Sequence, residues 1–266
     1  MTHFDDIGFN FQESKDLADF LSAQLPSAKL HFPLIKTSDA RPYLIHEIKI
    51  DQIRFFATTK AGNKGEPEFA CANPGFMGSI WRKFRVEKIY KKGSCDYCII
   101  FEGALEAQNP LAEEDFSTQD QDMAGKTRAT SAHFQALNYL TRDSELKQGD
   151  IINVNIVVFP HYIKVSKKDE TKMHGAFMQA KQIKEISGKS TEEIPDDVYG
   201  LAGEIKDWKE IENPASKQKF LYLILRQEIL GDFEVVAPMP PPGVSQEEIQ
   251  KGNIAFCEGW LSGIIG

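Results

Sequence analysis

Two cysteines three residues apart form the most chemically suggestive motif in the sequence. Cys95-Asp96-Tyr97-Cys98 has the C-x-x-C spacing that zinc sites and thioredoxin-like redox sites share. A structural zinc ion needs four ligands, but Cys71 and Cys257 are isolated in the sequence without a nearby histidine. A redox motif places its first cysteine at a helix N-terminus, whereas this pair follows a hairpin turn and leads into an expected strand. We therefore interpret these thiols as structural and predict no metal site.

The other residue types that support catalysis show no productive spacing. The six histidines form no i, i+4 helical pair and no H-x-H motif. His161 and His174 flank the polar segment 166–171, which leaves a joint site between them open. No serine lies in a G-x-S-x-G elbow, no glycines form a Walker A loop or G-x-G-x-x-G, and Ser262 is interpreted as a packing residue beside Trp260. We predict no catalytic residue and no cofactor, and favour a non-enzymatic protein.

A stretch of cations interleaved with aromatic residues is the strongest candidate for a binding site. Residues 82–92 carry six cations against a single acid, Glu87. Such a stretch can bind an anion or an acidic partner, although a solvated sheet face is the plain alternative. The candidate binding residues are Trp81, Arg82, Lys83, Arg85 and Tyr90.

An acidic segment follows this basic stretch closely in the sequence. Residues 111–126 contain five acids and one lysine, and we expect them to form a solvated insert. The net charge of −8 opposes binding of a long polyanion, so nucleic acid is disfavoured as a partner without being excluded. The absence of catalytic spacing, the strand content and the expected loops at 111–126 and 238–243 favour another protein as the partner.

The composition is that of an ordinary globular protein. Hydrophobic residues make up 41% and charged residues 26% of the 266 residues, enough to bury a core without disulfides. The first residues lack the basic and apolar regions of a secretory signal, and no run approaches the ~18 apolar residues of a membrane span. Four scattered cysteines do not form a disulfide framework. We predict a cytoplasmic protein without a membrane segment.

Hydrophobic periodicity divides the chain into three expected regions. Region 1–78 begins with an expected strand at 4–11 and a helix capped by Ser14, which Pro26 ends. Further strands are expected at 29–36, 42–50, 52–59 and 66–72. One helix packed on an antiparallel sheet is the simplest arrangement for this region.

The middle region, 79–197, is expected to be rich in β-strands. It holds a hairpin of strands 81–90 and 97–102, the acidic insert, and a segment 131–141 whose pattern fits helix and strand equally. A strand is predicted at 151–159, with 162–165 as its possible continuation beyond a bend at Pro160, and 173–186 is weakly helical. This region therefore combines a hairpin with a long separate strand.

The C-terminal region, 198–266, reads as a small β-barrel-like unit. Its apolar runs predict strands at 220–230, 233–237 and 256–265, whereas 205–211 fits a strand or a short helical turn. Ser245 and Glu248 have the spacing of a capping box. The predicted fold class is α+β, predominantly antiparallel β: an N-terminal helix-on-sheet region followed by one or two small OB-like or folded-over β units.

A short echo suggests an internal duplication. Segments 147–151 and 250–254 both place a glycine before an apolar strand, and each follows a hairpin that begins near Val86 or Ile205. A glycine-polar-apolar opening is common among β proteins, so the duplication is a hypothesis.

The sequence resembles an uncharacterised family of bacterial proteins. The marks that carry this resemblance are short and consist of turn and core residues. They are His3-Phe4, Ile7-Gly8-Phe9, Asn73-Pro74-Gly75-Phe76-Met77-Gly78, Asn213-Pro214, Gly231-Asp232-Phe233-Glu234-Val235-Val236-Ala237 and Trp260-Leu261-Ser262-Gly263. The resemblance implies a bacterial source and no particular activity.

Three hypotheses of function follow. The first is a non-catalytic binding or accessory protein that presents sheet surfaces and loops to a protein partner. The second is an OB-like binder of single-stranded nucleic acid or oligosaccharide, which requires Trp81, Tyr90, Trp208 and Tyr222 to be exposed. The third is a hydrolase or transferase whose site comes from distant residues, with His161 and His174 as candidates. We favour the first.

Overall fold

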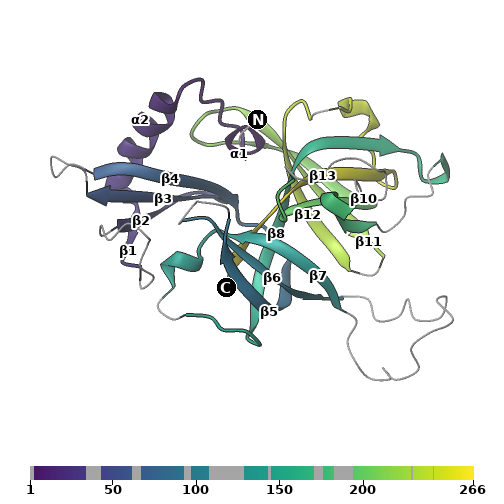
Figure 1. Cartoon of the computed structure of the whole chain (residues 1–266). Coiled ribbons are helices and arrows are strands. Elements are labelled where there is room, and N and C mark those ends of the chain that lie inside the picture. Colours follow the sequence, from purple (N-terminus) through teal and green to yellow (C-terminus); the bar gives the residue numbers. More distant parts are fainter. Residues whose placement is uncertain are drawn as a thin grey trace.

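The structure is a computed structural model that is mostly β, with short helices at its N-terminal end (Figure 1). The residues it describes are 3–33, 43–61, 67–92, 97–107, 129–142, 145–170, 176–182, 194–228, 230–241 and 243–266. These residues form one sheet of four strands and one of nine. Antiparallel pairs predominate in both sheets, and a helix precedes the strands, which confirms the predicted fold class.

The N-terminal segment is helical where the sequence pattern predicted a strand. Helix α1 spans His3–Asp6, and a turn through Gly8 (φ +76°) follows it. The prediction of a strand at 4–11 was wrong, because the alternating aromatic residues converge on one cluster instead of lining one face of a strand. Phe4 and Phe9 both contact Phe55, at ring-centroid distances of 5.8 and 5.3 Å.

Helix α2 spans Ser14–Gln24 and a 3₁₀ turn, Leu25–Ser27, follows it. Its N-cap is Glu13, one residue before the predicted cap, and the backbone N–H of Glu13 donates to Asp16 Oδ2 at 3.0 Å. Pro26 lies in the 3₁₀ turn, which confirms the predicted end of the helix.

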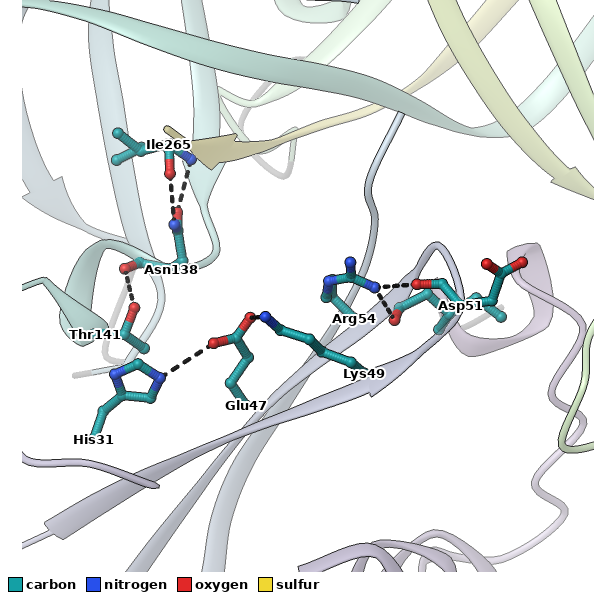
Figure 2. Close-up of polar contacts among 9 residues, drawn as sticks. His31, Glu47, Lys49, Asp51, Arg54, Asn138, Thr141 and Ile265 are labelled. Carbon is teal, nitrogen blue, oxygen red and sulfur yellow. Dashed lines mark hydrogen bonds and ion pairs between the residues drawn. The ribbon is translucent and has the colours of Figure 1, made fainter. Parts of the chain in front are cut away.

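The four-stranded sheet is an antiparallel meander in the order β1-β2-β3-β4. The strands are β1 (Lys29–His31), β2 (Tyr43–Ile50), β3 (Ile53–Ala61) and β4 (Pro67–Phe76). This confirms a strand in each of the four predicted ranges, with β3 two and β4 four residues longer at their ends; residues 34–36 of the first range lie outside the described residues. Figure 2 shows Glu47 of β2 between His31 and Lys49. The Glu47 carboxylate lies 3.2 Å from His31 Nε2 and 3.3 Å from Lys49 Nζ.

The two faces of this sheet have different coverings. Ile48, Phe55 and Phe76 belong to a core cluster with Leu21 of α2 and Phe220 of the larger sheet. The opposite face contributes residues such as Ile45 and Phe56 to the main core of the larger sheet. Residues of the larger sheet therefore contribute to the cores on both faces of the small sheet, and α2 covers one of these faces (Figure 1).

The larger sheet contains the rest of the strands. They are β5 (Trp81–Lys91), β6 (Ile99–Glu106), β7 (Ala129–Ala136), β8 (Ile151–Ser166), β9 (Phe177–Gln179), β10 (Val198–Glu212), β11 (Lys219–Gln227), β12 (Gly231–Pro238) and β13 (Ile254–Ile265). The ambiguous segment 131–141 is strand β7 followed by a 3₁₀ turn, Tyr139–Thr141. Within the weakly helical range 173–186, residues 180–182 are helical and Phe177–Gln179 is a strand, whereas residues 173–175 and 183–186 lie outside the described part.

Strand pairings close this sheet into two five-stranded rings that share two strands. The first barrel runs β5-β6-β7-β13-β8 and back to β5, and the second runs β10-β11-β12-β8-β13 and back to β10. In each ring the third strand of a meander pairs in parallel with a shared strand: β7 with β13, and β12 with β8. Small five-stranded barrels of this mixed, Greek-key type are OB-like. The side chain of Asn138 extends the β7–β13 pairing, because it bonds both backbone groups of Ile265 at 2.7 and 2.8 Å (Figure 2).

The two rings are built alike, as the sequence echo suggested. The backbone N–H of Gly149 donates to the backbone oxygen of Val86 at 2.8 Å. In the same way, the backbone N–H of Gly252 donates to the backbone oxygen of Ile205 at 2.9 Å. Both glycines have positive φ, +94° and +89°, which favours glycine at this strand opening. Each meander then has a β-bulge directly after the bonded residue, between Val86 and Lys88 or between Ile205 and Asp207. The equivalence supports the duplication hypothesis.

A single main core fills both rings. It includes Phe84 and Phe134 of the first barrel together with Leu223 and Val235 of the second. The division into regions 1–78, 79–197 and 198–266 stays a prediction. Its boundaries fall before β5 and at β10, but β8 and β13 each complete both barrels.

Candidate binding surface on strand β5

Strand β5 presents alternate residues to solvent and to the core of the first barrel. Phe84 and Val86 are buried, whereas Trp81, Lys83 and Arg85 are exposed. This alternation follows from the two-residue period of a strand whose inner face covers a closed core. The candidate residues Trp81, Lys83 and Arg85 therefore do share one outward face.

The neighbouring strand β8 adds an apolar residue to that face. Lys83 pairs with Asn153 and Arg85 pairs with Ile151 in the antiparallel register. Ile151 is 63% exposed and Trp81 is 41% exposed, high values for such large apolar side chains. We call this face, made of Trp81, Lys83, Arg85, Ile151 and Asn153, the β5–β8 surface.

The cations on the β5–β8 surface are available to a partner. Among the residues that the structure describes, neither Lys83 nor Arg85 has an ion-pair partner. Further along β5, Lys88 lies 3.7 Å from Glu102 of β6. Positive charge without a local counter-ion thus concentrates at the Trp81 end of the strand, on a molecule of net charge −8.

Arg82 points the other way and serves the interior. It is 4% exposed, donates to the backbone oxygen of Asp232, and its guanidinium carbon lies 4.1 Å from the Phe233 ring centroid. Burial lowers the pKa of Arg82 to about 10, against the opposing effect of Asp232 and Glu234. Arg82 connects β5 to β12 and does not belong to the β5–β8 surface.

Tyr90 lies near the other end of β5, beyond the β-bulge. Its hydroxyl donates to Asp196 Oδ2 at 3.3 Å, and the Lys88 ammonium lies 4.9 Å from its ring centroid. Burial and the adjacent Asp196 raise the pKa of Tyr90. The structure therefore does not bring Tyr90 together with Trp81.

A polar network near Tyr90 was not anticipated from the sequence. His133 of β7 lies 3.0 Å from Tyr199 Oη through Nδ1 and 3.5 Å from Glu102 through Nε2. Tyr199 is buried, which raises the pKa of its hydroxyl, so it is a poor nucleophile. Gln179 of β9 also contacts His133, at 2.6 Å. These bonds attach β9 and β10 to the first barrel. Glu102 and His133 lie close together because β6 pairs with β7, which the sequence does not show.

A buried carboxylate fixes the chain where β5 begins. Glu234 of β12 is fully buried and accepts from the backbone N–H of Ser79 at 2.6 Å and of Ile80 at 3.2 Å. Asn155 and the hydroxyl of Tyr222 also donate to it, at 2.7 and 2.6 Å. These bonds hold residues 79 and 80 in place and so orient Trp81 next to them.

Two pairs of the marks that carry the family resemblance are in contact in the structure. A Cβ on Gly78 would lie 1.9 Å from Glu234 Oε2, so the glycine of one mark fits the acid of another. Asn213 donates to the backbone oxygen of Ile7 at 2.7 Å, which joins two further marks. The contacts of these residues join separate segments of the fold.

Cys71, which is isolated in the sequence, lies beside Cys98 in the structure. Its Sγ lies 3.9 Å from Cys98 Sγ, and Cys95 lies outside the described residues. Cys257 is buried. Within the described ranges, no group of three or more His, Cys, Asp or Glu side chains is placed to hold a metal ion.

The remaining candidates do not form a common site. His161 lies 2.9 Å from Glu258 and 5.1 Å, between ring centroids, from Trp260, whereas His174 lies outside the described residues. Of the aromatic residues that an OB-like ligand site would need, Tyr222 is buried against the N-terminal core and Trp208 is half-buried.

Among the described residues, none of the helices has the length and apolar character needed to cross a membrane. Consistent with a resemblance to an uncharacterised family, no family model, no curated protein and no solved structure matches this chain.

Proposed function

We propose that this protein is a non-catalytic binding or accessory protein that docks a partner protein on the β5–β8 surface. The observation that carries the proposal is the exposure of Trp81 and Ile151 beside two cations, Lys83 and Arg85, that have no ion-pair partner among the described residues. Tryptophan and arginine are enriched at the energetic centres of protein interfaces. A rigid sheet face also presents them at little entropic cost.

The charge of the surface indicates the chemistry of the partner. Lys83 and Arg85 attract an acidic surface, while Trp81 and Ile151 supply apolar contact area. The whole chain is acidic, with a net charge of −8, so an acidic partner would be oriented toward this face and repelled by the others. We place this interaction in the cytoplasm of a bacterium, on the basis of the sequence.

The arrangement favours a protein partner over a single nucleic-acid strand. Proteins that bind single-stranded nucleic acid stack successive bases on several exposed aromatic residues along one basic groove. Here Trp81 is exposed, Tyr90 is engaged with Asp196, and Tyr222 is buried. One exposed tryptophan at the edge of a short cationic face suits an interface better than a stacking platform.

The experiment compares two matched double variants. Trp81→Ala/Lys83→Glu alters the β5–β8 surface, and Tyr162→Ala/Lys164→Glu alters an aromatic–lysine pair with the same spacing elsewhere; Tyr162 is 43% exposed and Lys164 is exposed. A partner is captured from the source organism, identified, purified, and titrated against each protein. We expect the first variant to bind at least about 30-fold more weakly, the size of one strong interface residue.

The control variant is expected to bind like the wild type. Raising the salt concentration should weaken wild-type binding, since exposed charges are screened. Equal binding by both variants would contradict the proposal. So would salt-dependent quenching of Trp fluorescence by a single-stranded oligonucleotide, which would favour the OB-like alternative.

A further inference from the structure

Two cysteines from different sheets lie side by side. Cys71 is in β4 of the four-stranded sheet, and Cys98 directly precedes β6 of the first barrel. Their Sγ atoms are 3.9 Å apart, although the residues are far apart in sequence. A β-bulge in β4, where Thr58 pairs with Cys71 and Thr59 with Phe69, lies next to Cys71. Bulges often redirect a neighbouring side chain.

A shared acceptor holds the two thiols together. Asn73 Oδ1 lies 3.6 Å from Cys71 Sγ and 3.8 Å from Cys98 Sγ. The Asn73 oxygen also accepts from Gln135 Nε2 at 3.0 Å, which fixes it against β7 of the first barrel. Both cysteine residues are partly buried, whereas Cys257 is buried. The site is therefore polar and held from both sheets.

We propose that Cys71 and Cys98 are an oxidation-sensitive pair that forms a disulfide on exposure to a low-molecular-weight disulfide such as oxidised glutathione. The thiolate of one cysteine attacks the glutathione disulfide, which forms a mixed disulfide and releases one glutathione. The second thiolate then attacks the protein sulfur of the mixed disulfide and releases the second glutathione. The protein loses two protons and two electrons, and glutathione disulfide gains them.

The geometry requires only a small movement for this bond. The sulfur atoms must approach from 3.9 Å to about 2 Å, which side-chain rotation and a slight shift of the sheets can supply. The bond would tie the four-stranded sheet to the first barrel and would close a loop containing all of β5. This inference goes beyond the docking proposal and does not depend on it.

Cys257 supplies an internal control. It is fully buried, and burial raises the pKa of its thiol to about 12, so it has little thiolate and no access to glutathione. We expect it to stay reduced in the folded protein under the same conditions.

The test exposes the reduced full-length protein to a glutathione buffer of increasing oxidation and then counts thiols after denaturation. We expect the count to fall from four to two, with a loss of two hydrogens in the intact mass. A protease that cleaves before aspartate separates Cys95 from Cys98 at Asp96, so mass spectrometry can assign the cross-linked peptides. The expected cross-link joins Cys71 to Cys98.

Variants provide an independent measurement. Cys95→Ser and Cys257→Ser should retain the cross-link, whereas Cys98→Ser should abolish it. The inference would be overturned by four intact thiols in oxidising buffer, or by a disulfide that joins Cys95 to either Cys71 or Cys98. Because the cross-link is mapped in the wild type, a variant that fails to fold does not affect the result.

Discussion

Five hydrogen bonds converge on the carboxylate of Glu234, a residue whose sequence context gave no hint of them. Its partners are two groups of Ser79, the N–H of Ile80, Asn155 and Tyr222. They come from two other strands, β8 and β11, and from the segment between β4 and β5, so only the fold brings them together. A single sequence shows the acid but not its donors.

The variant Glu234→Ala should lower the free energy of unfolding by about 3 kcal/mol or more, because it leaves buried donors without an acceptor. Urea denaturation measures this change. The exposed Glu247→Ala is the control and should change the free energy by less than about 0.5 kcal/mol. A loss for Glu234→Ala no larger than that of the control would show that the network does not stabilise the fold.

His46 should make stability depend on pH. Burial lowers its pKa below the usual value of 6.5, and its Nε2 lies 2.9 Å from Thr59 Oγ1. As the pH falls below about 6.5, the unfolded chain takes up the proton first, so the native state loses stability until the folded pKa is passed. Denaturation at pH 7.5 and pH 5 should show a larger loss for the wild type than for His46→Gln. An equal loss would exclude this contribution.

Part of the candidate surface could be predicted from the sequence. The two-residue period of a strand places Trp81, Lys83 and Arg85 on one face. The same period places Arg82 on the opposite face, so the prediction that included Arg82 in one binding site with these three residues did not apply the period. Tyr90 could not be placed, because the bulge after Val86 shifts the alternation and no sequence feature marks it. Ile151 joins the surface only through the pairing of β8 with β5.

At the scale of elements, strand positions were predictable and strand ends less so. The hydrophobic pattern located β5 and β11, and the predicted continuation of strand 151–159 through 162–165 is confirmed. Strand β8 continues to Ser166, since Pro160 pairs with Gly259 next to a β-bulge. A Cβ on Gly259 would lie 2.3 Å from the backbone oxygen of Phe159, so the glycine permits this close approach.

Substitution of Gly103 and of Gly149 by alanine compares the cost of a steric clash with the cost of an unfavourable backbone conformation. A Cβ at Gly103 would lie 2.1 Å from the backbone oxygen of Arg85 and 2.8 Å from the Phe84 ring, whereas nothing lies within 4 Å of one at Gly149. Gly103→Ala should cost about 3 kcal/mol, at the upper end for overpacking. Gly149→Ala, with φ +94°, should cost about 1 kcal/mol. Thermal and urea denaturation giving the reverse order would contradict the close approach of β5 and β6.

At the scale of the whole molecule, the sequence indicated OB-like units but could not show how they interlock. The parallel pairs β7–β13 and β12–β8 join segments separated by most of the chain's second half. The hydrophobic periodicity of a single strand does not predict which distant strand pairs with it, because any apolar strand could complete the ring. The echo at Gly149 and Gly252 was the one local signal of two similar halves.

Shared strands predict that the C-terminal region does not fold alone. A fragment of residues 198–266 contains β10 to β13 but lacks β8, which pairs with both β12 and β13. We expect its NMR spectrum to show the narrow dispersion of an unfolded chain, while the full-length protein gives a dispersed spectrum. A well-dispersed spectrum from the fragment would mean that the second barrel closes without β8.

The central claim is that a protein partner docks on the β5–β8 surface, and site-specific photo-crosslinking tests it most directly. A photoreactive residue is placed at position 83 of β5 or at position 164 of β8, both exposed sites occupied by lysine. In cells of the source organism, position 83 should form a covalent adduct with one identified acidic protein and position 164 should not. Equal adducts from both positions, or an adduct from position 164 alone, would contradict the claim.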